Sequence, residues 1–580
     1  MYKKAYVGKK LPNNKYKIFL WEEDSELQVI DYENVVYQEC DPENAFAVGL
    51  NGEPLKPINA GNWKFSKNPN YSNQNTPNLH FHDMPIEQKF LVERYGINDV
   101  PSTGHRELFF DIECEIGGAL TEEYIQRAPM PITSIAWWDK KADEWAIIIL
   151  DRKNQLKDIE LENKKVIACS TEKILLKKFV EIVRDINPDI LIGYNSDYFD
   201  VPYLYHRMCN VIGKDWADQL SPVGQVQSKA YTKYFFRKDQ FVKIIGVESL
   251  DYMRLHRKYS WKDEPSWKLD AIGEKYTGLN KIEYDGTLDD LFEQDIHKFI
   301  EYNFRDVEIL KLLDEKLQYI ALTKNLAHKG KHNYEEVYMN SITQDGAISA
   351  YLLSKSIIPP AKTFKQKKKE GYAGGYLFCP KAGLYKYMFD EDLTSLYPSI
   401  IMSINIGKET LKGRIIDADD RNNRLGLNDL KERDPEEELL VENKNRRQAY
   451  VPVKKLIQMI EENNLAISAN GVFFETNRES VLSTILKKWF EERVIYKGRM
   501  KAAYKAKDTV KGEYNYLMQY TMKILLNSLY GATALGSFRY GNVILSEAIT
   551  LSGQRIIQES ALCANRHMNK VIRNEINLEI

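Results

Sequence analysis

The stretch that decides the fold is Lys523-Ile524-Leu525-Leu526-Asn527-Ser528-Leu529-Tyr530-Gly531. On a helix, Lys523, Asn527 and Tyr530 share one face, because positions i, i+4 and i+7 point within about 40° of one another. An ammonium, an amide and a phenol in a row suit a ligand with phosphates at one end and a flat base at the other. The alternative is an amphipathic helix whose polar face meets water. Five fixed residue types would match by chance in this length with a probability on the order of 10⁻⁴, which favours the functional interpretation.

Length and composition indicate an ordinary globular chain. Its 580 residues suggest roughly three to five domains, and 43% hydrophobic and 28% charged residues are typical of soluble proteins. The net charge is −2, so any affinity for nucleic acid must come from local basic surfaces. Six cysteines without a C-x-x-C pair favour reduced thiols over disulfides or zinc. No apolar run resembles a signal peptide or a membrane span. We therefore expect a cytoplasmic protein (host cytoplasm if viral) that contacts no membrane.

Three segments carry no motif of their own. Residues 1–102 contain short apolar and aromatic runs and a stretch rich in Asn, Pro and Gly, which predicts an open, β-rich N-terminal domain. Residues 327–332 are polar and resemble a linker. Residues 412–450 are charged, and we interpret them as a surface elaboration without a metal site.

Between them, carboxylates recur in a suggestive pattern. Asp111 and Glu113 lie in an apolar strand and point to the same face, where they repel each other unless a cation sits between them. Asp200 follows a turn after a buried strand and enters a helix. Asp197 is the rival carboxylate, which we interpret as a helix-start residue. Taken singly, such patterns usually belong to structural or solvated positions.

A third pattern completes the set. Tyr302 and Asp306 stand at i and i+4 on a helix. The order Asp-x-Glu, Asp, Tyr-x-x-x-Asp resembles the three motifs of the DEDD 3′→5′ exonucleases that proofread for DNA polymerases. The resemblance implies two divalent cations about 4 Å apart, one generating hydroxide and one stabilising the leaving 3′ oxygen. It assigns Tyr302 to orienting the attacking water, and as catalytic metal ligands it assigns Asp111, Glu113, Asp200 and Asp306.

Asp392-Leu393-Thr394-Ser395-Leu396-Tyr397-Pro398 follows a strand candidate at 384–389 and resembles motif A of the family B DNA polymerases. The resemblance implies that Asp392 is catalytic and binds metal together with the carbonyl of Leu393. It places Leu393, Leu396 and Tyr397 on the nucleotide, with the Tyr397 ring under the sugar, where it rejects ribonucleotides. Asp390 shares the strand face of Asp392, so spacing alone leaves both open; the Ser-Leu-Tyr-Pro register favours Asp392.

Basic residues surround the opening stretch. From 487 to 523 there are ten Lys/Arg and four Asp/Glu, and Arg493, Lys497 and Lys501 form one stripe of a helix predicted over 481–507. Two antiparallel helices with facing cations would clamp a triphosphate. A solvated basic hairpin explains the charges but not the Asn-Ser-Leu-Tyr-Gly that follows them. The pattern resembles family B fingers, which implies nucleotide contacts by Arg493, Lys497, Lys523, Asn527 and Tyr530.

A glycine motif follows a basic run at 362–369. Tyr372, Gly374 and Gly375 resemble the Tyr-x-Gly-Gly motif that contacts DNA in family B polymerases. A solvated charged face is the alternative. In the DNA-contact interpretation, the glycines allow the protein backbone to approach the phosphodiester backbone of DNA closely.

Motif order over the whole chain resembles the T-even-type bacteriophage replicative DNA polymerases. The resemblance implies a multidomain α+β and α/β protein whose partners are primer-template DNA, single-stranded 3′ ends and dNTPs. Its cofactor would be Mg²⁺, two ions per active site, with Mn²⁺ as an alternative. We predict an N-terminal domain (1–102), an RNase H-like exonuclease domain (103–326), a return segment (327–363), a first part of the palm (364–480), helical fingers (481–535) and an incomplete second part of the palm (536–580).

One expected element is missing from this pattern. The family's second polymerase carboxylate comes from a Tyr-Gly-Asp-Thr-Asp-Ser hairpin, but no aspartate follows Asp508. We therefore expect the N-terminal part of a split or truncated polymerase, for which a separate C-terminal chain supplies the second catalytic aspartate and the thumb. The alternatives are a stand-alone 3′→5′ DNA exonuclease and a non-catalytic DNA-binding scaffold.

Overall fold

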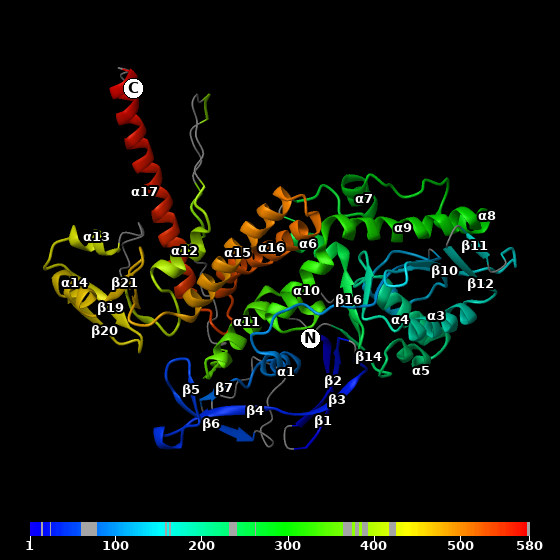
Figure 1. Cartoon of the computed structure of the whole chain (residues 1–580), viewed down its shortest axis with the longest axis horizontal. Coiled ribbons are helices and arrows are strands. Elements are labelled where there is room, and N and C mark those ends of the chain that lie inside the picture. The colour runs from blue at the N-terminus through cyan, green and yellow to red at the C-terminus, as the bar shows by residue number, and fades with distance from the viewer. Residues whose placement is uncertain are drawn as a thin grey trace. The chain divides into compact units, whose positions relative to one another are not determined.

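The chain forms two compact units in a computed structural model (Figure 1). One contains residues 1–34 and 85–339, and the other contains 35–84 and 340–580. The first hundred residues therefore divide between the units, and the finer domain boundaries stay predictions. The structure describes all residues except 13–14, 24, 60–77, 116, 157–158, 162–163, 231–239, 261–262, 363–373, 378–381, 385–391, 417–424 and 577–580.

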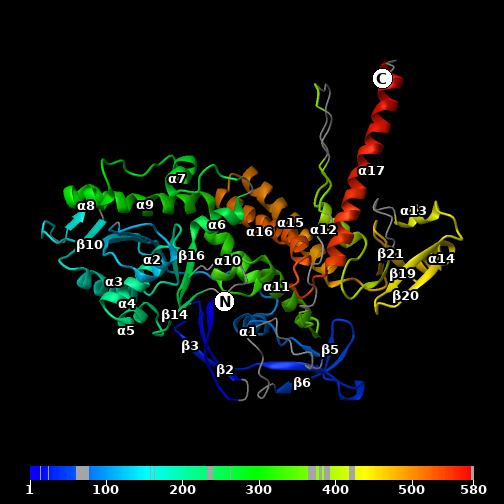
Figure 2. The same cartoon turned by 180° about the vertical axis from the view of Figure 1, so that it is seen from behind.

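A mixed seven-stranded sheet is the centre of the first unit, with the strand order β11-β12-β10-β9-β8-β13-β16. Strand β8 pairs antiparallel with β9 and parallel with β13. Helix α9 covers one face, and α3 and α4 lie on the other (Figure 2). The strands are β8 (Glu107–Cys114), β9 (Ile132–Asp139), β10 (Glu144–Leu150), β11 (Ile159–Leu161), β12 (Lys164–Cys169), β13 (Ile190–Gly193) and β16 (Glu248–Asp251).

The other elements of this unit are short strands and helices. A sheet β1-β2-β3 and a hairpin β14-β15 accompany the central sheet. These strands are β1 (Tyr2–Lys10), β2 (Lys15–Glu22), β3 (Gln28–Glu33), β14 (Val226–Ala230) and β15 (Gln240–Ile244). The helices are α1 (Ile86–Tyr95), α2 (Glu122–Arg127), α3 (Glu172–Ile186), α4 (Asp200–Val211), α5 (Lys214–Ala217), α6 (Tyr252–Tyr259), α7 (Leu269–Thr277), α8 (Leu288–Gln294), α9 (Ile296–Leu317) and α10 (Tyr319–Gly330).

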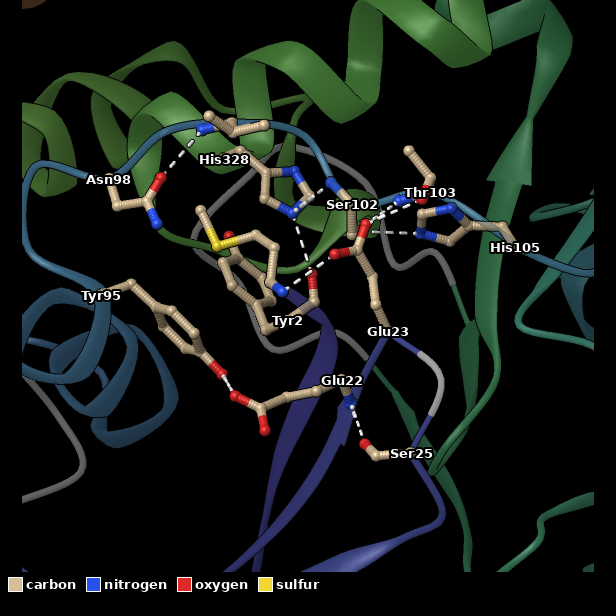
Figure 3. A network of polar contacts seen from close by, with 12 residues as sticks. Tyr2, Glu22, Glu23, Ser25, Tyr95, Asn98, Ser102, Thr103, His105 and His328 are labelled. Atoms are coloured by element: carbon tan, nitrogen blue, oxygen red, sulfur yellow. Dashed lines mark hydrogen bonds and ion pairs between the residues drawn. The ribbon is translucent and has the colours of Figure 1, made fainter.

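Residues 327–332 are buried, so their interpretation as a linker was wrong. The hydroxyl of Tyr2 lies 3.0 Å from the carbonyl oxygen of Ala327 and 2.9 Å from that of His332. Nε2 of His328 lies 2.9 Å from the carbonyl oxygen of Tyr2 (Figure 3). Burial is the main reason why the pKa of His328 falls to about 4, so the ring is neutral. Polar side chains are buried here because the first strand, over three hundred residues away in sequence, satisfies them.

The second unit combines a small sheet with long helices. Its sheet order is β17-β5-β6-β4-β7. The strands are β4 (Val35–Glu39), β5 (Ala47–Gly49), β6 (Pro54–Asn59), β7 (Leu79–His80) and β17 (Ile357–Ile358). Helices α15 and α16 pack against each other and run antiparallel, because only residues 506–508 connect them (Figure 1). The helices are α11 (Asn340–Ser354), α12 (Leu396–Ser403), α15 (Val481–Lys505), α16 (Thr509–Thr533) and α17 (Val543–Ile576).

The segment expected to be a surface elaboration has a core of its own, so that prediction was wrong. A sheet of order β20-β19-β18-β22-β21 packs its apolar residues with those of α14. Buried Ile415, Leu430, Leu439, Leu456 and Phe473 form this core. The sequence analysis missed this core because the many charged residues hid the alternating apolar positions of its short strands. The elements are β18 (Leu411–Ile415), α13 (Leu427–Lys431), β19 (Glu438–Asn443), β20 (Gln448–Pro452), α14 (Val453–Glu462), β21 (Leu465–Ile467) and β22 (Val472–Glu475).

The chain is thus a mixed α/β multidomain protein, as predicted. Among the described residues, none of the helices combines the length and the apolar character needed to cross a bilayer.

Candidate functional site

Three elements of the first unit bring the predicted metal ligands together. Strand β8 alternates its side chains, so Asp111 and Glu113 share a face, and α9 places Asp306 beside them. Their ligand atoms all lie within 4.8 Å of one another. Asp200, the first residue of α4, accepts a hydrogen bond of 3.3 Å from the backbone N–H of Ile112, between the two β8 carboxylates. The four carboxylates therefore share one site.

Burial and mutual repulsion make these carboxyl groups reluctant to ionise. Burial, followed by the charges of Asp306, Asp200 and Glu113, raises the pKa of Asp111 well above its ordinary value. Burial and the Asp306 charge raise the pKa of Glu113 to about 8, and burial is the main cause that brings that of Asp200 to about 7. A divalent cation would remove this penalty, because it offsets the like charges.

The donor set fits hard divalent cations. All four candidate ligands offer carboxylate oxygens, the donors that Mg²⁺ and Mn²⁺ prefer. Oδ1 of Asp306 is buried and accepts no hydrogen bond among the described residues. An orphaned buried acceptor of this kind is costly unless something occupies it. The residues therefore fit a metal centre.

Lys281 enters the site from a loop, and sequence reasoning missed it. Its Nζ forms an ion pair with Asp306 and donates a hydrogen bond of 3.1 Å to the hydroxyl of Tyr302. Burial works to lower the pKa of Lys281, but the Asp306 charge outweighs it and the pKa is raised. The ammonium supplies part of the charge that a cation would bring. No motif marks this lysine, because it stands in an irregular loop far from the other ligands in sequence.

Asn303 is a second residue that the sequence analysis missed. Its Nδ2 donates to Oδ2 of Asp111 at 2.7 Å, and its Oδ1 accepts from the hydroxyl of Ser134 at 2.8 Å. The amide is held between α9 and β9 and fixes the rotamer of Asp111. Its position next to Tyr302 in the motif was the only signal that could have found it.

Asp197 does not start a helix, so that interpretation was wrong. Helix α4 begins at Asp200, and its N-cap is Phe199. Asp197 forms an ion pair with Arg254 and accepts a hydrogen bond of 3.1 Å from the hydroxyl of Ser249. Its carboxylate is used structurally at the end of β16.

In the second unit, two predicted nucleotide residues meet. The rings of Tyr397, on α12, and Tyr530, on α16, have centroids 4.4 Å apart and planes inclined by 30°. Glycines make room for Tyr397: a Cβ at Gly375 would lie 3.0 Å from its hydroxyl, and one at Gly553 would lie 3.1 Å from its ring. The carbonyl of Gly374 accepts a hydrogen bond of 2.6 Å from Nε2 of Gln554.

The candidate polymerase carboxylate stands apart. Asp392 is exposed, and within the described part of the chain it belongs to no group of three metal-ligating side chains. Leu393 and Leu396 are half-buried beside it. Asp390 and Tyr372 lie outside the described residues, so the choice between Asp390 and Asp392 stays open.

The predicted fingers residues are divided between the two paired helices. Arg493 and Lys497 belong to α15, whereas Lys523 and Asn527 belong to α16. Lys497 and Asn527 are exposed. Nε of Arg493 is buried and donates to no partner among the described residues, and burial lowers the pKa of this guanidinium. A buried donor without an acceptor suits an anionic ligand.

Comparison with known protein families gives two matches that together cover most of the chain. Residues 83–272 match the model of the DNA polymerase family B exonuclease domain. Residues 339–579 match the model of DNA polymerase family B. The first match contains Asp111, Glu113 and Asp200, and the second contains Asp392 and the predicted fingers.

Curated relatives agree with these matches. The chain is 26% identical to a DNA-directed DNA polymerase of Escherichia phage RB69, over 75% of this chain and 50% of the relative. It is 26% identical to that of Enterobacteria phage T4, over 69% of this chain and 46% of the relative. A Pyrococcus glycovorans DNA polymerase is 24% identical over 82% of this chain and 53% of its own length. The chain thus spans about half the length of the curated relatives it matches.

Proposed function

Since this chain belongs to the family B DNA polymerases, we propose that its first unit is a 3′→5′ DNA exonuclease and that its second unit binds dNTPs and primer-template DNA. The observation that carries the proposal is the convergence of Asp111, Glu113 and Asp306 within 4.8 Å, with Asp200 at the same site. This arrangement suits an RNase H-like nuclease. Because the relatives named above belong to phages, we propose that the activity is exercised in the host cytoplasm.

The side chains of the nuclease site divide the work. Asp111, Glu113, Asp200 and Asp306 would hold two Mg²⁺ ions, or Mn²⁺ instead, which when bound activate water and stabilise the leaving 3′ oxygen. Tyr302 would orient the attacking water through its hydroxyl. Lys281 donates a hydrogen bond to that hydroxyl, and its ammonium can stabilise the negative charge that develops at the scissile phosphate. Asn303 keeps Asp111 in its binding rotamer.

The second unit supports nucleotide binding for synthesis. Arg493, whose buried Nε has no partner among the described residues, would pair with the triphosphate together with Lys497, Lys523 and Asn527. The paired rings of Tyr397 and Tyr530 would pack under the sugar and base, and Gly374 and Gly375 would lie along DNA. A stand-alone exonuclease has no use for these residues, which favours a polymerase part.

Synthesis needs a second carboxylate beside Asp392, since two metal ions share the polymerase site. No aspartate follows Asp508 in these 580 residues. We propose that this carboxylate and the thumb come from a polypeptide segment outside these 580 residues. Adding such a segment, with primer-template and dNTPs, should give primer extension that these 580 residues alone do not give.

The nuclease proposal is tested with end-labelled single-stranded DNA. The purified chain with Mg²⁺ should shorten DNA from the 3′ end, and Asp111→Asn should lower the rate by about 10³-fold, because a metal ligand is lost while the Asn303 hydrogen bond can persist. Asp215→Asn, an exposed aspartate of α5, is the matched control and should leave the rate unchanged. A wild-type chain that binds DNA but cuts with neither Mg²⁺ nor Mn²⁺ would favour the scaffold alternative.

A further inference from the structure

A second group of metal-ligating side chains lies in the second unit and shares no residue with the sites described above. Glu39, Glu53 and His80 place one ligand atom each within 4.8 Å of one another. They come from three neighbouring strands: Glu39 ends β4, Glu53 precedes β6 and His80 ends β7. None of them was singled out by the sequence, because they belong to no motif.

Strand register puts all three on one face of the sheet. Tyr37 pairs with His80 on β7, and Glu39 pairs with Leu55 on β6. Directly opposed residues share a face, and so do residues two apart on one strand. Glu39 is therefore the central member, with His80 diagonally across one neighbouring strand and Glu53 diagonally across the other.

The two carboxylates are held in place by asparagines. Glu39 accepts from Nδ2 of Asn78 at 2.7 Å. Asn51 donates to both oxygens of Glu53, from its backbone at 2.8 Å and its side chain at 2.7 Å. A Cβ at Gly49 would lie only 2.4 Å from Oε2 of Glu53, so the carboxylate occupies a cradle that only glycine leaves open. Outer hydrogen bonds of this kind are typical of metal ligands.

Among the described residues, His80 is the basic side chain that contacts this cluster. Within the described part of the chain, neither Glu39 nor Glu53 forms an ion pair with a lysine or arginine; Glu39 only meets Nε2 of His80 at 3.2 Å. His80 is 6% exposed, and its Nε2 is the ring nitrogen that meets Glu39. Two carboxylates and a buried imidazole therefore meet in one cluster.

We propose that Glu39, Glu53 and His80 bind one divalent transition-metal ion of the Zn²⁺ class. Imidazole with two carboxylates suits Zn²⁺ or Mn²⁺, whereas Mg²⁺ prefers an all-oxygen set such as the nuclease carboxylates. The ion would tie β4, β6 and β7 together and so stabilise residues 35–84 in the folded state.

Zinc binding by the full chain tests the site. The nuclease cluster is first silenced by Asp111→Asn with Glu113→Gln, and excess Mg²⁺ is present throughout. Calorimetric titration should then show one Zn²⁺ per chain, and Zn²⁺ should raise the Tm. Glu53→Gln and His80→Gln should each weaken Zn²⁺ at least about tenfold. Glu43→Gln, an exposed glutamate nearby, is the matched control and should bind as the parent does.

Gly49→Ala tests whether weaker Zn²⁺ binding can arise without misfolding. It keeps every ligand but pushes the Glu53 carboxylate aside, so it should also weaken Zn²⁺ while far-UV circular dichroism stays unchanged. Co²⁺ in place of Zn²⁺ should give a visible spectrum with nitrogen ligation that His80→Gln abolishes. Absence of Zn²⁺ binding in the silenced chain, or equal affinity in the parent, Glu53→Gln and Gly49→Ala, would overturn the proposal.

Discussion

At the scale of single residues, the proposed nuclease site is a balance between like charges and one lysine. Four carboxylates share a space in which burial raises the pKa of Glu113 to about 8 and of Asp200 to about 7. Lys281 relieves only Asp306 directly. Without metal, the site is therefore expected to retain protons near neutral pH, and cation binding must release them.

This balance predicts how pH acts on the metal-free protein. The pKa values of Glu113 and Asp200 are raised on folding, so the folded state binds more protons than the unfolded state between their ordinary and raised values. Stability of the first unit should thus fall as pH rises from about 5 to about 8. Thermal melts in EDTA measure this, and Mg²⁺ should raise the Tm more at the upper end. A Tm that is flat or rising over this range would contradict the assignment.

Removing the lysine should expose the same repulsion. Lys281→Met leaves buried Asp306 without its cation, and because Lys281 is 31% exposed the expected loss is about 1–3 kcal/mol of unfolding free energy. The loss should be large at pH about 8, small at about 5 where the carboxyls are protonated, and mostly restored by Mg²⁺. Denaturant melts measure it. Lys268→Met, an exposed lysine at the start of α7, should change nothing; equal losses at both pH values would point to lost packing instead.

At the scale of elements, periodic segments were predictable and irregular ones were not. Strand β8 and helices α9, α15 and α16 carry clear patterns of period two or 3.6, and the structure confirms them. Site ligands on these elements could therefore be named in advance. Lys281 could not, since it lies in a loop, and residues 327–332 looked like a linker because their partner is the first strand.

Two glycines in different elements should respond oppositely to alanine. A Cβ at Gly193, at the end of β13, would lie 2.5 Å from the Cβ of Ser196 and would displace the turn that leads to Asp200. Gly193→Ala should cost about 1–3 kcal/mol and most of the nuclease rate. Gly498, inside α15, has open space around it, so Gly498→Ala should stabilise its helix by about 0.5–1 kcal/mol.

Chemical denaturation and the single-strand nuclease assay measure both effects. The Gly498 variant also serves as the control for activity, because α15 belongs to the other unit. A nuclease rate that survives Gly193→Ala would show that the turn can relax without moving Asp200.

At the scale of the whole molecule, each unit is assembled from segments that are distant in sequence. Residues 35–84 leave the first unit and fold with 340–580, after which the chain returns. The motifs of both units could be recognised in the sequence, but the assignment of residues 35–84 to the second unit could not. An alternating strand has the same pattern whichever unit it packs in. Fully buried Arg539 shows what holds it: its Nε donates to Asp345 at 2.8 Å, and its Nη1 pairs with Asp83 from the exchanged segment.

Loss of that buried network should destabilise the second unit without destabilising the first. Arg539→Met removes the guanidinium that pairs with both Asp83 and Asp345 and leaves the two carboxylates buried, so the second unit should lose about 3–5 kcal/mol of unfolding free energy. The first unit has its own core and should keep its transition and its nuclease activity. Calorimetry should therefore show one transition moving to lower temperature while the other stays.

Arg566→Met, which changes an exposed arginine of α17, is the control for this variant. A common fall of both transitions would mean that the two units unfold as one, because a loss confined to one buried cluster can reach the other only through a shared cooperative unit.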